Sequence, residues 1–439
     1  MTEIRPFRAL RYNPARVTPD DVIAPPYDVV GADAVAALHT RSPYNAAHLE
    51  NPAGTGDARF AGAKKTLDAW LKDKALVRDA TPALYVYEQR AKIEGHWVSR
   101  RCVFARTRLH RPEEGIVRPH EATLSGPREE RLRLIRATRT NISPIFATFL
   151  DPTHAASDLI AKVAGTEPDF EAHDRLGDRH RLWVVTNKAQ IATLTGVLDA
   201  TNITIADGHH RTHTALDYRD EAAAKAGKRW TGHEPENFAL MGLIPEDDPG
   251  LVILPIHRLV KDLGEGDVLP ERFLERLSAL YRVEVLSTDG GAAAVEAAWG
   301  RVQANAYGPT AFAILGVDGP HSIYLATARS QEAIDAAMPQ GLSTASKRLD
   351  ARILTETVLT PIFGIDRAAL AAGRVEFTES AEEAREAVER GACRLAFLIN
   401  ATRVQQVTEV ADAGEVMPQK STFFYPKLAT GLVFNSLDD

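Results

Sequence analysis

The sequence contains few cysteines, and the two that occur are far apart. Cys102 and Cys393 are the only ones in 439 residues, and both stand in strand-like surroundings. This spacing argues against a disulfide framework or a cysteine-based zinc site, and it suits a reducing compartment. We therefore expect a cytoplasmic protein.

Long apolar runs and an excess of positive charge are also missing. No run approaches the roughly 20 apolar residues that cross a bilayer, and residues 1–7 lack the apolar core of a signal peptide. The net charge is −7, so the surface as a whole does not attract nucleic acid. We expect neither a membrane nor a nucleic acid as a partner.

Three common catalytic signatures are absent: the G-x-S-x-G elbow, the H-E-x-x-H zinc motif and the dinucleotide glycine fingerprint. No internal repeat is visible. The apolar fraction is 44% and the charged fraction 25%, which is ordinary for a globular protein. A chain of this length can bury two or three cores.

Strand and helix patterns alternate along the chain and predict a mixed α/β (α+β) fold. The segment 17–30 is rich in proline and is expected to be a loop. Helices are expected at 57–75, 127–138, 154–164 and 189–200. Strands are expected at 83–89 and 97–106, joined by a turn at Glu94–Gly95, and at 142–150, 169–173, 181–186 and 203–206.

The pattern changes character near residue 237, where apolar strands begin to alternate with further helices. These helices are expected near 270–280, 291–306, 330–337, 346–358 and 380–390. We expect a first domain at 1–236 that carries the chemistry and an α/β domain at 237–405. The segment 406–439 is too aromatic for a disordered tail and should pack back on the body.

A strand, a tight turn and a helix start meet within residues 203–212. Gly208 can adopt positive φ, and Arg211 offers a planar fork for a phosphate. His209 and His210 can donate to phosphate oxygens, and Asp207 can cap the helix or hold the water shell of a metal ion. Together with the helix dipole, these groups predict an anion site. The alternative is an N-cap aspartate, a turn glycine and solvated histidines.

A second polar stretch runs from Arg118 to Glu121 and is followed by Thr123. Pro119 keeps Arg118 extended, so His120 and Glu121 are expected on a stiff loop before a helix. Glu121 is either a general base or a structural ion-pair partner. Eleven arginines and no lysine lie between residues 100 and 139. They form either an ion-paired helix face or a positive wall around a phosphorylated ligand.

These two stretches carry a resemblance. Residues 205–211 (Ile-Ala-Asp-Gly-His-His-Arg) resemble the phosphate-binding signature of the ParB/sulfiredoxin-like superfamily, in the form found in free serine kinases. Those kinases also carry a Pro-His-Glu stretch upstream, which residues 119–121 match. Over its whole length the chain is similar to the bacterial and archaeal DUF family numbered 1015. The landmarks are residues 5–7, 26–28, 120–121, 207–211, 417–422 and 425–427.

The resemblance implies a ParB/sulfiredoxin-like nucleotide-binding core and a small-molecule kinase. It would transfer a phosphoryl group from ATP or ADP to free L-serine, giving O-phosphoserine. Glu121 would be the base, with His120 and Asp207 beside it, and Mg²⁺ would lie near Asp207. The phosphates would be bound by Gly208, His209, His210, Arg211, Arg118 and Lys420. The separation of Glu121 from Asp207 is longer than in a minimal ParB-like domain, so an insertion must be folded away.

Two other functions stay open. One is a nucleotide-binding regulator or DNA-partition-like protein in which the same loop senses a nucleotide without transferring phosphate. The other is a zinc hydrolase, because His209 and His213 stand one helical turn apart. Sulfiredoxin-type reduction is disfavoured, since His209 stands where those enzymes need a cysteine. The sequence leaves the oligomeric state open, a homo-oligomer included.

Overall fold

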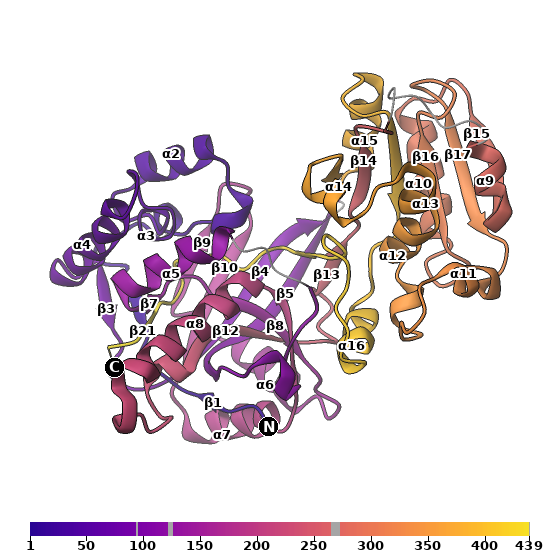
Figure 1. Cartoon of the computed structure of the whole chain (residues 1–439). Coiled ribbons are helices and arrows are strands. Elements are labelled where there is room, and N and C mark those ends of the chain that lie inside the picture. Colours follow the sequence, from indigo (N-terminus) through magenta and orange to yellow (C-terminus); the bar gives the residue numbers. More distant parts are fainter. Residues whose placement is uncertain (94, 122–125, 265–272, 439) are drawn as a thin grey trace. The chain divides into compact units, whose positions relative to one another are not determined.

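The computed structural model of the chain describes residues 1–93, 95–121, 126–264 and 273–438 (Figure 1). It confirms the mixed α/β fold. The chain divides into two compact units: unit 1 is Met1–Val252 with Pro426–Asp439, and unit 2 is Ile253–Tyr425. Glu94 and Thr123 lie outside the described residues, as do 270–272 of one expected helix.

Unit 1 is built on one large sheet in which, among the residues that the structure describes, two pairs of neighbouring strands are parallel. These are β6 with β11 and β8 with β12. In spatial order the strands are β6 (Val117–Pro119), β11 (Ile203–Asp207), β8 (Ile145–Phe149), β12 (Phe238–Pro245), β5 (His96–Arg108), β4 (Leu84–Ile93), β10 (Arg179–Val185) and β9 (Phe170–His173), with β1 (Ile4–Arg5) also on β5. Because β12 lies between β8 and β5, the structure divides the chain after Val252 rather than at the expected 236/237 boundary.

Helices pack around this sheet, some of them on its strands and others on those helices. The longer ones are α4 (Ala58–Lys72), α5 (Gly126–Thr138), α6 (Ala155–Ala164), α7 (Lys188–Asp199) and α8 (His209–Ala226). Helix α6 packs on β4 and β5 and contacts α7, whereas α8 packs on β8, β12 and α5 (Figure 1). Helix α4 buries Phe60, Ala63, Leu67 and Trp70, the face that the sequence spacing predicts.

The proline-rich segment 17–30 is not a plain loop, so that prediction was wrong. It contains the short helix α1 (Pro19–Val22) and the 3-10 turn η1 (Tyr27–Val29). Proline is compatible with the first turn of a helix, where its missing N–H would have no partner in any case. The remaining short elements of this region are α2 (Ala32–Arg41), α3 (Ala47–Glu50), and β2 (Leu10–Tyr12) paired with β3 (Leu76–Arg78).

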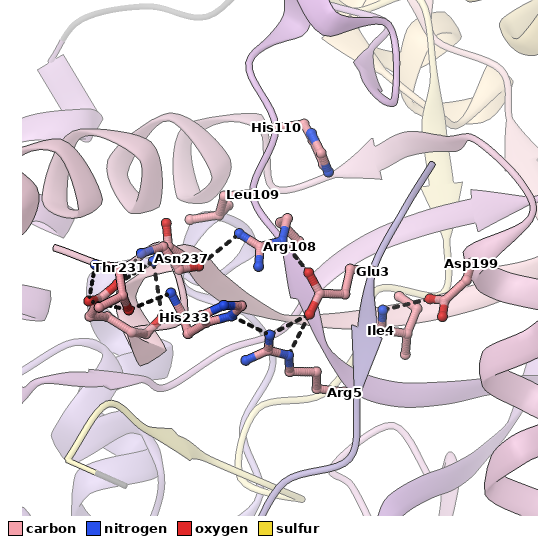
Figure 2. Close-up of polar contacts among 12 residues, drawn as sticks. Glu3, Ile4, Arg5, Arg108, Leu109, His110, Asp199, Thr231, His233 and Asn237 are labelled. Carbon is pink, nitrogen blue, oxygen red and sulfur yellow. Dashed lines mark hydrogen bonds and ion pairs between the residues drawn. The ribbon is translucent and has the colours of Figure 1, made fainter.

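The amino-terminal strand β1 is fixed by a charged cluster (Figure 2). The Glu3 carboxylate accepts from Arg5 Nε at 2.6 Å and also from Arg108, and both guanidinium groups lie over the Phe238 ring. The backbone N–H of Ile4 donates to Asp199 Oδ1 at 2.7 Å. The Arg5 landmark of the sequence therefore has a structural place, holding β1 on β5.

The carboxy-terminal residues thread back through unit 1. Thr430 pairs with Ala24, Phe434 pairs with Leu10, and β21 (Asn435–Ser436) pairs with β7 (Thr140–Asn141). At the start of this segment the fully buried Arg100 donates to the Pro426 carbonyl. These contacts bring the residue after Pro426, Lys427, into unit 1.

Unit 2 is a second sheet with helices on both faces. Its antiparallel order is β15 (Tyr281–Ser287), β17 (Ile323–Ala328), β16 (Ala311–Leu315), β19 (Leu395–Ile399), β14 (His257–Val260) and β18 (Val375–Thr378). Alternate residues of β16 enter two apolar clusters: Ala311 and Ala313 face one, and Phe312 and Ile314 face the other, as side chains of a strand must.

The helices of unit 2 are mostly short. They are α9 (Phe273–Leu280), α10 (Ala292–Gln303), α11 (Gln331–Ala337), α12 (Asp350–Leu354), α13 (Thr360–Phe363), α14 (Arg367–Ala371), α15 (Ala381–Glu389) and α16 (Val404–Asp412). The single helix expected at 346–358 is instead η6 (Ser346–Arg348), α12 and a π-helical turn, η7 (Thr355–Leu359). The remaining elements are the short strands β13 (Val252–Leu254) and β20 (Phe423–Tyr425) and the 3-10 turns η2 (Pro112–Glu114), η3 (Gly227–Arg229) and η4 (Pro235–Asn237). Within the described ranges, the helices are all too short or too polar to span a bilayer.

Candidate functional site

The two polar stretches of the sequence meet at one edge of the unit 1 sheet. Strands β6 and β11 are parallel neighbours, with Pro119 paired to Ile205. The residues that follow each strand therefore leave the sheet side by side, at the usual strand spacing of about 4.8 Å. His120 and Glu121 come next to the Asp207–Gly208 turn that begins α8. The carboxyl ends of parallel strands are where α/β sheets bind ligands.

Asp207 lies between two cations. Arg211 NH2 donates to its Oδ2 at 2.5 Å, and Lys427 Nζ contacts its Oδ1. Although burial raises it, the charges of Lys427 and Arg211 lower the pKa of Asp207 to about 2. Asp28 and Glu50 also act on the charge of Arg211, so cations and carboxylates are mixed around this turn. The N-cap of α8 is Gly208, so Asp207 is not the helix cap considered from the sequence.

Gly208 is required by two features of the turn. Its φ is +93°, a conformation that side chains rarely adopt. A Cβ at this position would also lie 3.0 Å from Arg211 Nε. The Arg211 side chain is 9% exposed, its NH1 donates to the Pro144 carbonyl, and its Nε has no partner in the described part of the chain. The absent side chain of Gly208 therefore makes room for the Arg211 guanidinium.

His120 and His209 are packed edge to face, with ring centroids 4.6 Å apart. His120 Nδ1 donates to the Ile205 carbonyl, and His209 Nε2 accepts the His120 backbone N–H at 3.3 Å. Burial lowers the pKa of His120 to about 4, and burial with the nearby His120 lowers the pKa of His209 well below its usual value. Both rings are neutral at pH 7, and His209 carries its proton on Nδ1.

The amino terminus of α8 has no side-chain cap among the described residues. Its first backbone hydrogen bond runs from Thr212 N–H to the Gly208 carbonyl at 2.9 Å. The preceding N–H groups, those of His209, His210 and Arg211, are those that a helix leaves without an internal partner. In contrast, Asn187 caps α7 with its side chain. The start of α8 thus follows directly on the Gly208 turn and contains Arg211, one of the two cations that contact Asp207.

The remaining predicted phosphate ligands are divided between the two units. Arg118 is half-buried, and its NH2 donates to Thr204 Oγ1 at 3.3 Å on the neighbouring strand. His210 is half-buried in the first turn of α8. Lys420, however, belongs to unit 2. The lysine that contacts Asp207 is Lys427, which the 425–427 landmark contains.

Most of the arginines between residues 100 and 139 are paired with carboxylates. Arg128 pairs with Asp217 and Arg136 with Glu221, and both pairs join α5 to α8. Others pair likewise, namely Arg101, Arg108, Arg111, Arg131, Arg133 and Arg139. This favours the ion-paired helix face over the positive wall.

One buried group was missed from the sequence. Glu50 is 2% exposed, and its Oε1 accepts from Ser143 Oγ at 2.9 Å and from Arg131 NH1 at 3.3 Å. These residues and Arg211 line a cavity of about 50 Å³. The Tyr27 ring of the 26–28 landmark lies 4.2 Å from the Arg131 guanidinium. Nothing in the local sequence marks Glu50, because α3 is only four residues long.

The described residues contain neither a cluster of metal ligands nor an ionised thiol. No cluster of three or more His, Cys, Asp or Glu side chains there can hold a metal ion. His213 Nδ1 donates to the His209 carbonyl at 2.9 Å, so its ring is engaged within α8. Burial raises the pKa of Cys393 to about 11 and that of Cys102 further. Neither thiol is ionised at neutral pH.

Comparison with known proteins gives one family and several solved structures. The model of DUF1015, described as a protein of unknown function, matches residues 4–351. Free serine kinase in complex with AMP is 17% identical, covers 74% of this chain and 86% of its own, and has a TM-score of 0.32. No curated protein matches the chain.

Two further structures show the same level of similarity. A mutant of free serine kinase in complex with ADP is 16% identical, with coverage of 74% and 87% and a TM-score of 0.32. A conserved hypothetical protein from Pyrococcus furiosus is 17% identical, with coverage of 77% and 96% and a TM-score of 0.33. TM-scores of this size leave the function to be argued from the site itself.

Proposed function

The chain belongs to the DUF1015 family, and we propose that it is a small-molecule kinase. The reaction is transfer of a phosphoryl group from a nucleotide, ATP or ADP, to a hydroxyl group. Free L-serine is the first candidate acceptor, on the resemblance of residues 119–121 and 205–211 to free serine kinases. The ParB/sulfiredoxin-like core is part of this proposal.

One observation carries the proposal: the parallel pairing of β6 with β11. This pairing supports a position for Glu121 next to the start of α8, where the proposal has an anion bind. Of the sequence interpretations, only the kinase uses both stretches together. A nucleotide sensor needs the helix start alone, and a zinc hydrolase needs a ligand set.

The anion would bind at the start of α8. Backbone N–H groups and the helix dipole favour a phosphate there. Arg211 and Lys427, which both contact Asp207, would supply cationic donors to that phosphate. The neutral His209 adds an Nδ1–H donor. Phosphoryl transfer depends mainly on such positioning and charge neutralisation.

Glu121 would act as the general base. A serine hydroxyl is a weak nucleophile near neutral pH, and a positioned base contributes typically about 10²–10⁴-fold. The Glu121 carboxylate takes the hydroxyl proton as the oxygen bonds to the terminal phosphorus of the nucleotide. The bond from that phosphorus to its bridging oxygen breaks, and the shortened nucleotide leaves with the electron pair.

The expectation of Mg²⁺ near Asp207, bound directly or through its water shell, stays a prediction, and the contacts of Asp207 bear only on direct binding. Both Asp207 oxygens accept from cations, Oδ2 from Arg211 and Oδ1 from Lys427. A metal ion bound directly to Asp207 would have to displace one of them. The residues do not fit a direct Mg²⁺ ligand here, and no step of the proposal runs through one.

The test is a phosphorus NMR assay of the full chain with ATP or ADP and a panel of hydroxyl acceptors, L-serine first. We expect a new phosphomonoester signal and its loss in Glu121→Gln. The matched control is Glu113→Gln, which changes an exposed carboxylate in the 3-10 turn Pro112–Glu114, just before β6. Nucleotide binding should survive Glu121→Gln and weaken in Arg211→Lys. Nucleotide binding without turnover for any acceptor would instead identify a nucleotide sensor.

A further inference from the structure

Unit 2 contains a polar cavity that the proposed kinase does not use. Its volume is about 290 Å³, close to the lower end of small-molecule sites, about 300 Å³. It lies where β19 ends and α16 begins, with walls from the segment after α10 and from η6 and α12. Every residue that lines it belongs to unit 2 and is described. Most of the lining side chains are polar.

One wall presents a partly unpaired guanidinium. Arg403 NH1 donates to the Ala306 carbonyl, and the guanidinium lies over the Tyr307 ring, 4.8 Å from its centroid. Among the described residues, Arg403 Nε and NH2 have no hydrogen-bond partner. Stacking on Tyr307 fixes the plane of the fork. The other arginine of the cavity, Arg348, is neutralised by both oxygens of Asp335.

The facing acid is Asp350, at the start of α12. Its carboxylate accepts from Thr310 Oγ1 at 3.0 Å and from the Asn400 side chain. Burial raises the pKa of Asp350 to about 6, and the charge of Arg403 lowers it only in part. An ionised carboxylate therefore lies near Arg403 without a direct salt bridge to it at pH 7. The protein maintains this charge separation at a cost in desolvation.

We propose that this cavity binds a free α-amino acid. Arg403 would bind the carboxylate with its two free donors, in the planar geometry that a guanidinium offers. Asp350 would bind the ammonium group, and the rest of the cavity would take the side chain. The proposal is independent of the kinase, since it concerns residues of the other unit.

The arrangement of charge favours this ligand class over a nucleotide. A nucleotide brings two or more negative charges, but only Arg403 offers free cationic donors, and Asp350 would repel a phosphate. A zwitterion carries one negative and one positive group, which can pair with Arg403 and Asp350 respectively. An amine without a carboxylate, or a carboxylate without an amine, would use only half of the site.

The test is calorimetric titration of the full chain with each of the common L-amino acids. Ethanolamine, propionate and AMP are the comparison probes. We expect at least one amino acid to bind, with ethanolamine and propionate at least tenfold weaker. Arg403→Gln and Asp350→Asn should each weaken binding at least tenfold. The control is Arg301→Gln, which should leave binding unchanged, because Arg301 is an exposed residue of α10 that pairs with Glu284 of β15. Binding should weaken below pH 6 as Asp350 takes a proton.

Variants in the other unit separate this proposal from the kinase. Binding in the unit 2 cavity should be unchanged in Glu121→Gln, which removes only the proposed phosphoryl transfer. Arg403→Lys, which keeps the charge, should fold and recover part of the affinity if Arg403→Gln is unstable by circular dichroism. The proposal is overturned if no amino acid binds, if binding survives both Arg403→Gln and Asp350→Asn, or if only AMP binds in an Arg403-dependent manner.

Discussion

Lys427 Nζ contacts Asp207 Oδ1 although the two residues are 220 positions apart in the chain. Their side chains are 12% and 14% exposed. The contact depends on the carboxy-terminal segment, whose first residue, Pro426, is held through its carbonyl by the buried Arg100. The candidate site is therefore closed only when the last residues of the chain have packed on unit 1.

The first prediction concerns that contact. Lys427→Met keeps the apolar stem and removes the charge, which leaves Asp207 with Arg211 alone. We expect the pKa of Asp207 to rise and the free energy of unfolding at pH 7 to fall by about 3 kcal/mol, as for a broken buried pair. Nucleotide affinity should fall at least tenfold. Urea unfolding and calorimetric titration measure the two effects.

Lys225→Met is the matched control, because Lys225 is an exposed lysine in the last turn of α8. It should leave both quantities unchanged. If Lys427→Met binds nucleotide as the unaltered chain does, Lys427 has no part in the anion site and serves stability alone.

The second prediction concerns Gly208. Gly208→Ala places a Cβ in a left-handed conformation, which costs roughly 1–2 kcal/mol, and presses it against Arg211 Nε at 3.0 Å. We expect lower stability and a displaced guanidinium, hence a loss of nucleotide affinity. Thermal unfolding and titration detect both.

Gly62→Ala is the comparison for that change. Gly62 lies within α4, and a Cβ there meets nothing within 4 Å. Alanine should stabilise the helix by about 0.5–1 kcal/mol. Equal stability loss in the two variants would show that the Gly208 turn is no more constrained than an ordinary helical position.

The third prediction concerns acid stability. The folded pKa of His120 is about 4 because the ring is buried, against an ordinary value of 6.5. Between these two pH values His120 is protonated in the unfolded chain but not in the folded chain. Its contribution to the free energy of unfolding is therefore fully present above pH 6.5 and is lost as the pH falls toward 4. At pH 5 this loss from His120 is roughly 2 kcal/mol.

Urea unfolding between pH 7 and pH 5 measures that slope. His120→Gln keeps a donor for the Ile205 carbonyl and cannot take the proton, so its slope should be shallower. His233→Gln, an exposed histidine that contacts Arg5, should retain the full slope. An unchanged slope in His120→Gln would assign the acid lability to other groups, such as His209.

Local patterns predicted local structure well. The apolar spacing of Phe60, Leu67 and Trp70 predicted the buried face of α4, and the Asp207–Gly208 turn predicted where β11 ends and α8 begins. Strands such as β14 and β18 were missed. They are four residues long and are stabilised by neighbours distant in sequence rather than by their own pattern.

The site itself could be predicted only in part. The residues of both stretches carry their own chemical signals, but Lys427 and Glu50 enter through contacts between distant segments. Two lysines, at 420 and 427, lay in the same carboxy-terminal stretch, and no local rule says which one lies near Asp207. The sequence pattern changes at β12, which made this strand look like the start of a second domain. In the structure β12 lies between β8 and β5 in the sheet of unit 1, through contacts with strands that are distant in sequence.

The fourth prediction concerns Asp350 in unit 2. Its folded pKa is about 6 because of burial, against an ordinary value of 3.8. The folded chain therefore holds a proton that the unfolded chain releases, and stability falls as the pH rises from about 4 to about 6 and stays lower above it. Asp350→Asn removes this penalty and keeps an acceptor for Thr310, so unit 2 should gain up to about 3 kcal/mol at pH 7. Glu296→Gln, which changes an exposed carboxylate on α10, should leave the stability unchanged.

Urea unfolding of the unaltered chain and of both variants at pH 5 and pH 8 makes the comparison. A variant that is more stable yet loses its amino-acid ligand would show that the charge is kept for binding, since residues that serve a site often reduce stability. A variant less stable than the unaltered chain would mean that the carboxylate serves the fold.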